Sequence, residues 1–229
     1  MENHCISVGS FDVHYILLRK QVKNINLRIN SSGEICVSAN KFVPIDKIDK
    51  FVGSKVEWIL ERRRQINKRM EISKPDFVKR QITIFGYDLK IKISIQKYNR
   101  VTYDNEYLYV YLKSKDDLEK VIKKFLKQLC RDVYDDICKI TYNTMLKDYQ
   151  IEYPNIKIRE MTSRWGSCMP NKNQITLNSK LIHYPIEFIE YVILHEFVHF
   201  IQPNHSKQFY SIIEKYMPNY KNVLNEVQA

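Results

Sequence analysis

Apolar and polar residues alternate along the first forty residues of the chain. The alternation begins at Val13, turns at Ser31, Ser32 and Gly33, and resumes with Ile35, which predicts a β-hairpin. From residue 45 to about residue 70, apolar residues instead recur three and four positions apart, the spacing of one helix face. Strands followed by one helix are therefore predicted here.

Both patterns recur further along the chain. Residues 81–112 return to period two and predict three or four short strands, and residues 155–178 predict strands again. Ser114 and Asp117 have the spacing of a capping box, and the apolar stripe behind them predicts a long helix with one face to bury. Further helices are expected from Pro185 to about Gln202 and from Ser206 onward. The order predicts an α+β protein with domains at residues 1–112 and 113–229.

Cysteine usage and the amino-terminal segment bear on the cellular compartment. The five cysteines form no C-x-x-C pair, which argues against a disulfide framework and a thiolate zinc cluster; they are Cys5, Cys36, Cys130, Cys138 and Cys168. Glu2 and Asp12 interrupt the region where a signal peptide would need an apolar run, and no segment approaches the roughly 18 apolar residues of a membrane span. We expect a cytoplasmic protein with no membrane partner.

The formal net charge of +11 is concentrated in the amino-terminal part. Residues 1–100 hold 20 Lys and Arg against 10 Asp and Glu, whereas residues 101–229 hold 17 against 16. A basic half, with Arg62, Arg63 and Arg64 at its centre, could attract nucleic acid through counterion release. Abundant Lys, Ile, Asn and Tyr could equally reflect AT-rich coding, which is the interpretation we prefer.

The segment from His195 to His199 reads H-E-x-x-H within an apolar helical pattern. Two histidines four residues apart lie on one helix face, so both imidazoles can reach a single metal ion while Glu196 projects to its open side. Zinc takes neutral imidazole ligands, and a catalytic site uses three protein ligands so that one position stays open. The motif predicts a zinc site and a metal-assisted hydrolysis in which Glu196 is the base.

The spacing of the motif leaves the third ligand open. His205 follows His199 by six residues, just past Pro203, and gives the first-to-third spacing of metzincins, whereas Glu214 lies in the next predicted helix. We favour His205, although Gln202 stands where metzincins place a glycine. Cys168 is a weaker candidate for a further ligand.

A resemblance to a known family rests on three segments, RWGSC at residues 164–168, ITLN at 175–178 and HEFVHFIQPNHSKQFY at 195–210. Together with the region of residues 13–65 they resemble the YgjP-like metallopeptidase family, which is related to the SprT-like zincins. The resemblance implies that His195, His199 and His205 bind zinc and that Glu196 is the general base. It also implies a minimal zincin domain with a sheet, a backing helix and an active-site helix, and a peptide substrate.

Several roles around this site stay open in the sequence. Tyr210, Tyr216 or Arg164 could stabilise a developing oxyanion. Alternatively, the RWGSC segment is structural, with Trp165 filling space beside the active-site helix and Gly166 permitting close approach. Residues 175–178 are expected to form an edge strand that holds an extended peptide.

Two rival functions follow from the basic amino-terminal half. The first is a nucleic-acid-binding module in which the histidine site is structural. The second is a nucleic-acid-associated protease, in which the basic half docks on nucleic acid and the zincin half cleaves a protein held there.

Overall fold

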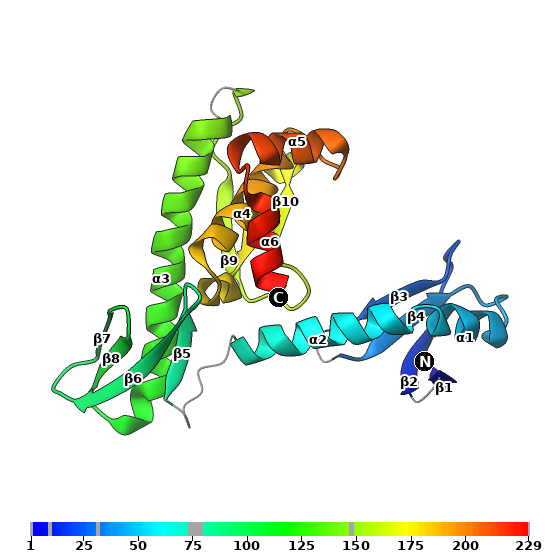
Figure 1. Ribbon diagram of the computed structural model, residues 1–229, viewed down its shortest axis with the longest axis horizontal. Helices are drawn as coiled ribbons and strands as arrows, with labels where there is room; N and C mark the ends of the chain where they lie inside the picture. Colours follow the sequence, from blue (N-terminus) through cyan, green and yellow to red (C-terminus); the bar gives the residue numbers. More distant parts are fainter. Residues whose placement is uncertain (1, 9–10, 31–32, 73–79, 147–148, 229) are drawn as a thin grey trace. The chain divides into compact units, whose positions relative to one another are not determined.

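The computed structural model describes residues 2–8, 11–30, 33–72, 80–146 and 149–228 (Figure 1). Contacts along the chain divide it into two compact units, Met1–Glu71 and Ile72–Ala229. The strands of residues 81–112 belong to the second unit, and a domain boundary at residue 112 stays a prediction. Helices and strands are mixed in both units, so the predicted α+β class is confirmed.

The first unit contains a four-stranded sheet in the order β1-β2-β4-β3. Its strands are β1 (Glu2–Val8), β2 (Phe11–Arg19), β3 (Asn26–Ile29) and β4 (Ile35–Ala39). Strands β3 and β4 pair antiparallel, which confirms the predicted hairpin, and Gly33 in its turn has a φ of 81° that favours glycine. Ser31 and Ser32 of that turn lie outside the described residues. Strand β2 pairs antiparallel with β1 and parallel with β4.

Two helices stand where one was predicted from residue 45 to about 70. Helix α1 spans Ile45–Gly53 and α2 spans Val56–Ile72. The break follows Gly53, a residue of low helix propensity, and the Ser54 hydroxyl donates to the Phe51 carbonyl at 2.7 Å. The single predicted helix was wrong, but its apolar positions are buried in the core of this unit: Ile48, Val52, Val56 and Ile59.

The three consecutive arginines of α2 contact their own unit. Arg63 donates through Nε to the Gly33 carbonyl at 2.9 Å and so ties the helix to the hairpin turn. Arg64 forms an ion pair with Glu61 at 3.2 Å, and Arg62 donates to the Gln65 side chain. The basic stretch therefore contributes to folding within the first unit.

The second unit begins with a four-stranded sheet in the order β5-β6-β8-β7, which confirms four strands in this region. The strands are β5 (Gln81–Ile84), β6 (Tyr87–Ile95), β7 (Arg100–Tyr103) and β8 (Tyr107–Leu112). A short 3-10 helix, η1 (Lys115–Asp117), leads into α3 (Leu118–Thr141), and the Ser114 hydroxyl accepts from the Asp116 amide. A π-helical turn, η2 (Tyr142–Leu146), ends this helix.

A second, three-stranded sheet has the order β10-β11-β9. Strand β9 spans Asn155–Arg159, β10 spans Gly166–Met169 and β11 spans Gln174–Asn178, with η4 (Pro170–Lys172) between the last two. Because β11 pairs antiparallel with β10 and parallel with β9, it is the central strand. The prediction of an edge strand at residues 175–178 was wrong, since both of its edges are already hydrogen-bonded to neighbours.

Three helices complete the second unit. After η5 (Ser179–His183), α4 spans Ile186–Val198, α5 spans Lys207–Tyr216 and α6 spans Tyr220–Gln228. Helix α4 ends four residues before the predicted Gln202, and α6 was not predicted. Tyr220 of α6 stacks on Tyr191 of α4 with ring centroids 6.1 Å apart. Among the described residues, no helix combines the length and apolarity needed to cross a membrane.

Candidate metal centre

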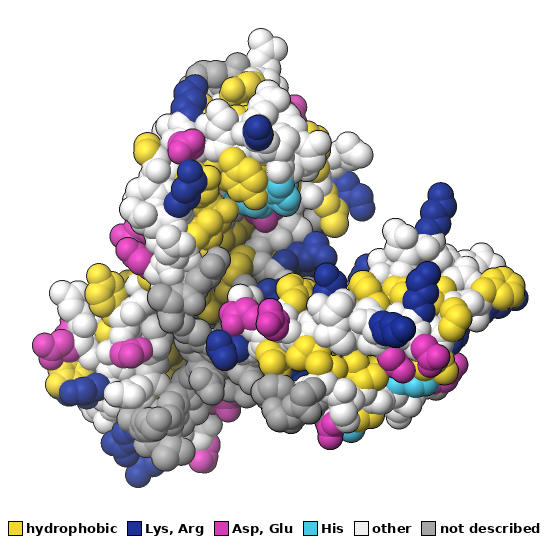
Figure 2. Space-filling model, turned by 45° about the vertical axis from the view of Figure 1, so that its right-hand side comes forward, with side chains coloured by type: hydrophobic (Ala, Val, Ile, Leu, Met, Phe, Trp, Pro, Cys, Tyr) yellow, Lys and Arg dark blue, Asp and Glu magenta, His cyan; other side chains and the backbone are white. Residues whose placement is uncertain are grey.

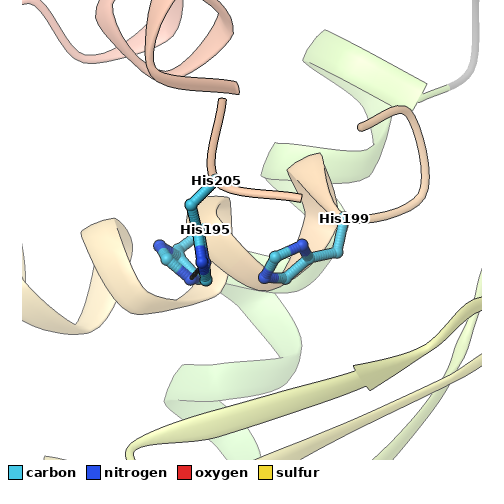
Figure 3. Close-up of side chains that lie close together, drawn as sticks. All are labelled: His195, His199 and His205. Carbon is cyan, nitrogen blue, oxygen red and sulfur yellow. Dashed lines mark hydrogen bonds between the residues drawn. The ribbon is translucent and has the colours of Figure 1, made fainter. Parts of the chain in front are cut away.

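Three histidines from two segments meet at the carboxyl end of α4 (Figure 3). His195 lies in the last turn of α4, His199 caps the same helix, and His205 belongs to the loop before α5. One ring nitrogen from each histidine lies within 4.8 Å of the nitrogens offered by the other two. The Nε2 atoms of His195 and His205 are 3.0 Å apart, although ten positions separate these residues. Figure 2 shows histidine side chains at the surface of the second unit, beside hydrophobic side chains.

The loop that returns His205 to the helix is held by Gln202. The Gln202 amide nitrogen donates to the Asn204 side chain and, at 3.2 Å, to the Ser206 hydroxyl, while its backbone amide bonds to the Val198 carbonyl. Ser206 in turn caps α5 by accepting from the Phe209 amide. A side-chain hydrogen-bond network therefore makes the turn in which metzincins use glycine.

The aromatic ring of Phe209 packs against all three imidazoles. Its ring is fully buried, and its centroid lies 4.9, 4.8 and 4.7 Å from those of His195, His199 and His205. Packing on one rigid ring limits the rotation of all three histidines. Phe209 falls within the helix predicted from Ser206 onward, but its contact with the histidines was not predicted, because it depends on the loop between α4 and α5.

Burial keeps the helix histidines neutral. It lowers the pKa of His195 to about 3, with smaller contributions from His199 and His205, and it also lowers the pKa of His199. His195 Nδ1 is buried and has no hydrogen-bond partner among the described residues. Three neutral imidazoles whose nitrogens converge are a donor set that fits a metal ion such as zinc.

Glu196 follows His195 in α4 and is buried, with 6% of its surface exposed. Burial raises the pKa of its carboxyl to about 8, against the opposing charge of Arg164. Its side chain packs directly on the backbone of Gly166 in β10, where a Cβ atom would lie 2.5 Å from Oε1. The close approach expected at Gly166 is thus made by the carboxylate of Glu196.

The loop that precedes β10 is fixed by Asn178. The Asn178 side chain is buried and donates to the carbonyls of Met161 and Arg164 at 2.7 and 2.9 Å, and its oxygen accepts from the Met161 and Lys180 amides. Trp165, at the end of this loop, packs edge-on against Tyr184 and against Phe188 of α4. The structural interpretation of Trp165 is confirmed, whereas the bracing by Asn178 was not foreseen.

Other residues singled out in the sequence lie in different environments. Glu214 is exposed and lies 3.7 Å from Lys221, outside the histidine cluster. Burial and the charge of Glu196 raise the pKa of the Cys168 thiol to about 12, so this cysteine is protonated near neutral pH. Tyr210 places its ring centroid 6.3 Å from that of His205 and stacks on Tyr220.

Comparison with known proteins identifies the family. The sequence model of the YgjP-like metallopeptidase domain matches residues 23–228. The chain belongs to the YgjP-like metallopeptidase family. No curated protein matches the sequence. A solved structure, the metallopeptidase zymogen of Methanocaldococcus jannaschii jannalysin, is 26% identical over 42% of this chain and 89% of that chain, with a TM-score of 0.35.

As a YgjP-like protein, the chain is a metallopeptidase, with peptides or proteins as substrates and a divalent metal implied. The match covers parts of both compact units, so most of the basic amino-terminal half is part of the family domain. Neither the family nor the contacts of Arg62, Arg63 and Arg64 support the nucleic-acid partner that the basic half left possible. The rival functions based on nucleic acid therefore have no support beyond the charge itself.

Proposed function

We propose that this protein is a zinc-dependent peptidase in which His195, His199 and His205 hold the metal and Glu196 is the general base. The observation that carries the proposal is the convergence of three histidine nitrogens within 4.8 Å from two separate segments. Histidine nitrogens suit zinc, and three protein ligands leave a position open for chemistry. When bound, zinc would act as a Lewis acid that lowers the pKa of water and polarises the scissile carbonyl.

We assign the proton transfer of this reaction to Glu196. It follows His195 directly in α4. As general base it accepts a proton from the attacking water, and as general acid it passes that proton to the departing amine. The backbone of Gly166 on one side of the carboxylate limits its positions, which supports this transfer role.

Arg164 and Tyr210 are candidates for binding the substrate oxygen. Arg164 is exposed and its charge acts on Glu196, and Tyr210 is 39% exposed and lies beside His205. Each could donate to an oxygen that becomes negative as the carbonyl is attacked. Among the described residues, no hydrogen bond or ring contact joins Tyr216 to the histidines, which makes it the weaker candidate.

The edge strand β10 is the proposed platform for the peptide. Among the strands that the structure describes, it pairs with β11 alone, and it packs against α4. A free strand edge can bind an extended peptide through backbone hydrogen bonds. This assignment replaces residues 175–178, which form the central strand.

The cytoplasmic location inferred from the sequence also stays part of this proposal. All five cysteines are free, which agrees with a reducing compartment.

Metal analysis of the purified protein, together with a peptide-library assay, tests the function. We expect bound zinc, hydrolysis that stops when a chelator removes the metal, and recovery when zinc is restored. Hydrolysis that persists unchanged after complete metal removal would contradict the proposal.

A further inference from the structure

A groove of about 590 Å³ lies between α3 and β9 and shares no residue with the histidine site. The helix and the strand contact one another in the second unit (Figure 1). Half-buried side chains of Leu126, Ile156 and Ile158 line it, so part of the groove is apolar. It extends along α3 from Glu119 to Arg131, about three helical turns.

Strand β9 presents a free edge to this groove. Among the described strands, β9 pairs only with β11, in parallel. The amide of Asn155 donates to the Asn173 carbonyl at 2.8 Å, so the backbone groups of Asn155 point toward β11. Successive residues of a strand direct their backbone groups to opposite sides. The backbone groups of Ile156 and Ile158 therefore face away from β11. An edge of this kind can pair with another extended chain.

The groove is also strongly basic. Its lining includes five Lys or Arg residues and two glutamates, and one pair among them, Lys180 and Glu160, is joined by an ion pair at 3.2 Å. The remaining basic residues are Lys123, Lys127, Arg131 and Arg159. None of these four has an ion-pair partner within the described part of the chain. Their charges are thus available to an acidic ligand.

The spacing of these charges matches an extended peptide. Lys123, Lys127 and Arg131 follow one another at intervals of four residues, so they lie on one face of α3 about 6 Å apart along its axis. Side chains on one face of a strand recur every two residues, at about 6.6 Å. A strand beside β9 with acidic residues at alternate positions could therefore meet successive basic side chains.

We propose that this groove binds an extended acidic segment of a protein substrate, which adds as a strand to the free edge of β9. The identity of the partner as a substrate rests on the proposed peptidase function. The binding itself rests on the groove alone. Backbone hydrogen bonds would provide affinity, and the basic row on α3 would select acidic side chains.

Fluorescence anisotropy with the full-length Glu196→Gln variant tests this binding without cleavage. The probe is a labelled peptide of about ten residues that alternates Glu and Val, compared with one that alternates Lys and Val. The acidic peptide should bind, and Lys123→Glu with Lys127→Glu should weaken its binding at least about tenfold. Lys120→Glu with Lys124→Glu is the matched control, because these exposed residues of α3 lie outside the groove.

A backbone test separates strand pairing from charge attraction. Peptides N-methylated at one set of alternate residues should lose binding, whereas methylation of the other set should have little effect, since only one set of amides faces β9. A labelled oligothymidylate should bind more weakly than the acidic peptide.

The proposal would be overturned if the acidic peptide did not bind, or if both double variants weakened its binding equally. It would also be overturned if N-methylation of either set of residues left binding unchanged, or if the oligonucleotide bound more tightly than the peptide and depended on Lys123 and Lys127. This assay needs neither metal nor hydrolysis. An inactive wild-type protein that still binds the peptide would contradict only the peptidase function.

Discussion

A Cβ atom on Gly166 would lie 2.5 Å from Oε1 of Glu196 and 2.6 Å from its Cγ. Real Cβ atoms do not approach other heavy atoms so closely, so either the carboxylate or strand β10 would have to move. The glycine therefore makes room for the residue that we assign as the base.

Gly166→Ala should reduce hydrolysis at least about a hundredfold while the metal stays bound, because misplacing a reacting group by about 1 Å has an effect of this size. Steady-state kinetics and metal analysis of the same sample check it. Gly53→Ala is the matched control, since a Cβ there would meet Val8 at an ordinary 3.6 Å. Full activity in Gly166→Ala would show that Glu196 is not held by this contact.

Glu196→Gln should retain stoichiometric zinc and lose hydrolysis by about two to four orders of magnitude, because glutamine cannot accept the proton. Glu187→Gln, an exposed position of the same helix, should leave both properties unchanged. Loss of zinc from Glu196→Gln would instead indicate a ligand or a structural role. Metal content and kcat measured together separate the two assignments.

Asn178→Ala should destabilise the protein by about 2 to 4 kcal/mol, because a buried side chain that donates to the carbonyls of Met161 and Arg164 is lost. Chemical denaturation gives the free energy of unfolding. Gln174→Ala, in the same strand, removes a weak 3.5 Å side-chain hydrogen bond to Thr176 and should cost less than about 1 kcal/mol. Similar losses in both variants would remove the special role of Asn178 in holding the loop.

His183 should make stability depend on pH. Burial lowers its pKa, opposed by the hydrogen bond between its Nδ1 and the Thr83 carbonyl, 2.6 Å away, and helped by the charge of Lys180. Because the unfolded chain then binds a proton that the folded chain does not, the contribution of His183 is lost as the pH falls below about 6.5.

His183→Asn preserves a donor to Thr83 and removes the titration, so its melting temperature should fall less than that of the wild type between about pH 7 and 5. Thermal melts of the two proteins across this range measure the difference. Parallel curves would mean that His183 does not titrate differently in the folded state.

Local patterns in the sequence predicted the parts of the site that one helix can specify. Whenever α4 forms, His195 and His199 lie on the same face of it, so their four-residue spacing predicts that they are close together. The separation of α1 from α2 was missed because the apolar stripe continues across the break at Ser54. Periodicity reports which face is buried, not whether the helix is continuous.

The pattern of apolar and polar residues could not predict contacts between segments that are distant in the sequence. The position of Phe209 beneath the histidines and the bracing of the loop by Asn178 depend on how α5 and β11 pack. The central position of β11 likewise depends on β9, which pairs with it in parallel after a long connection. The sequence left His205 and Glu214 open as the third ligand for the same reason.

Zinc affinity of the His205→Ala and Glu214→Ala variants tests the central claim most directly. Competition with a chromophoric chelator, followed by metal analysis, gives the affinity of each full-length protein. We expect His205→Ala to weaken zinc binding at least about a hundredfold, because it removes a proposed ligand, and Glu214→Ala to bind like the wild type. Wild-type affinity in His205→Ala, or an equal loss in Glu214→Ala, would contradict the three-histidine site.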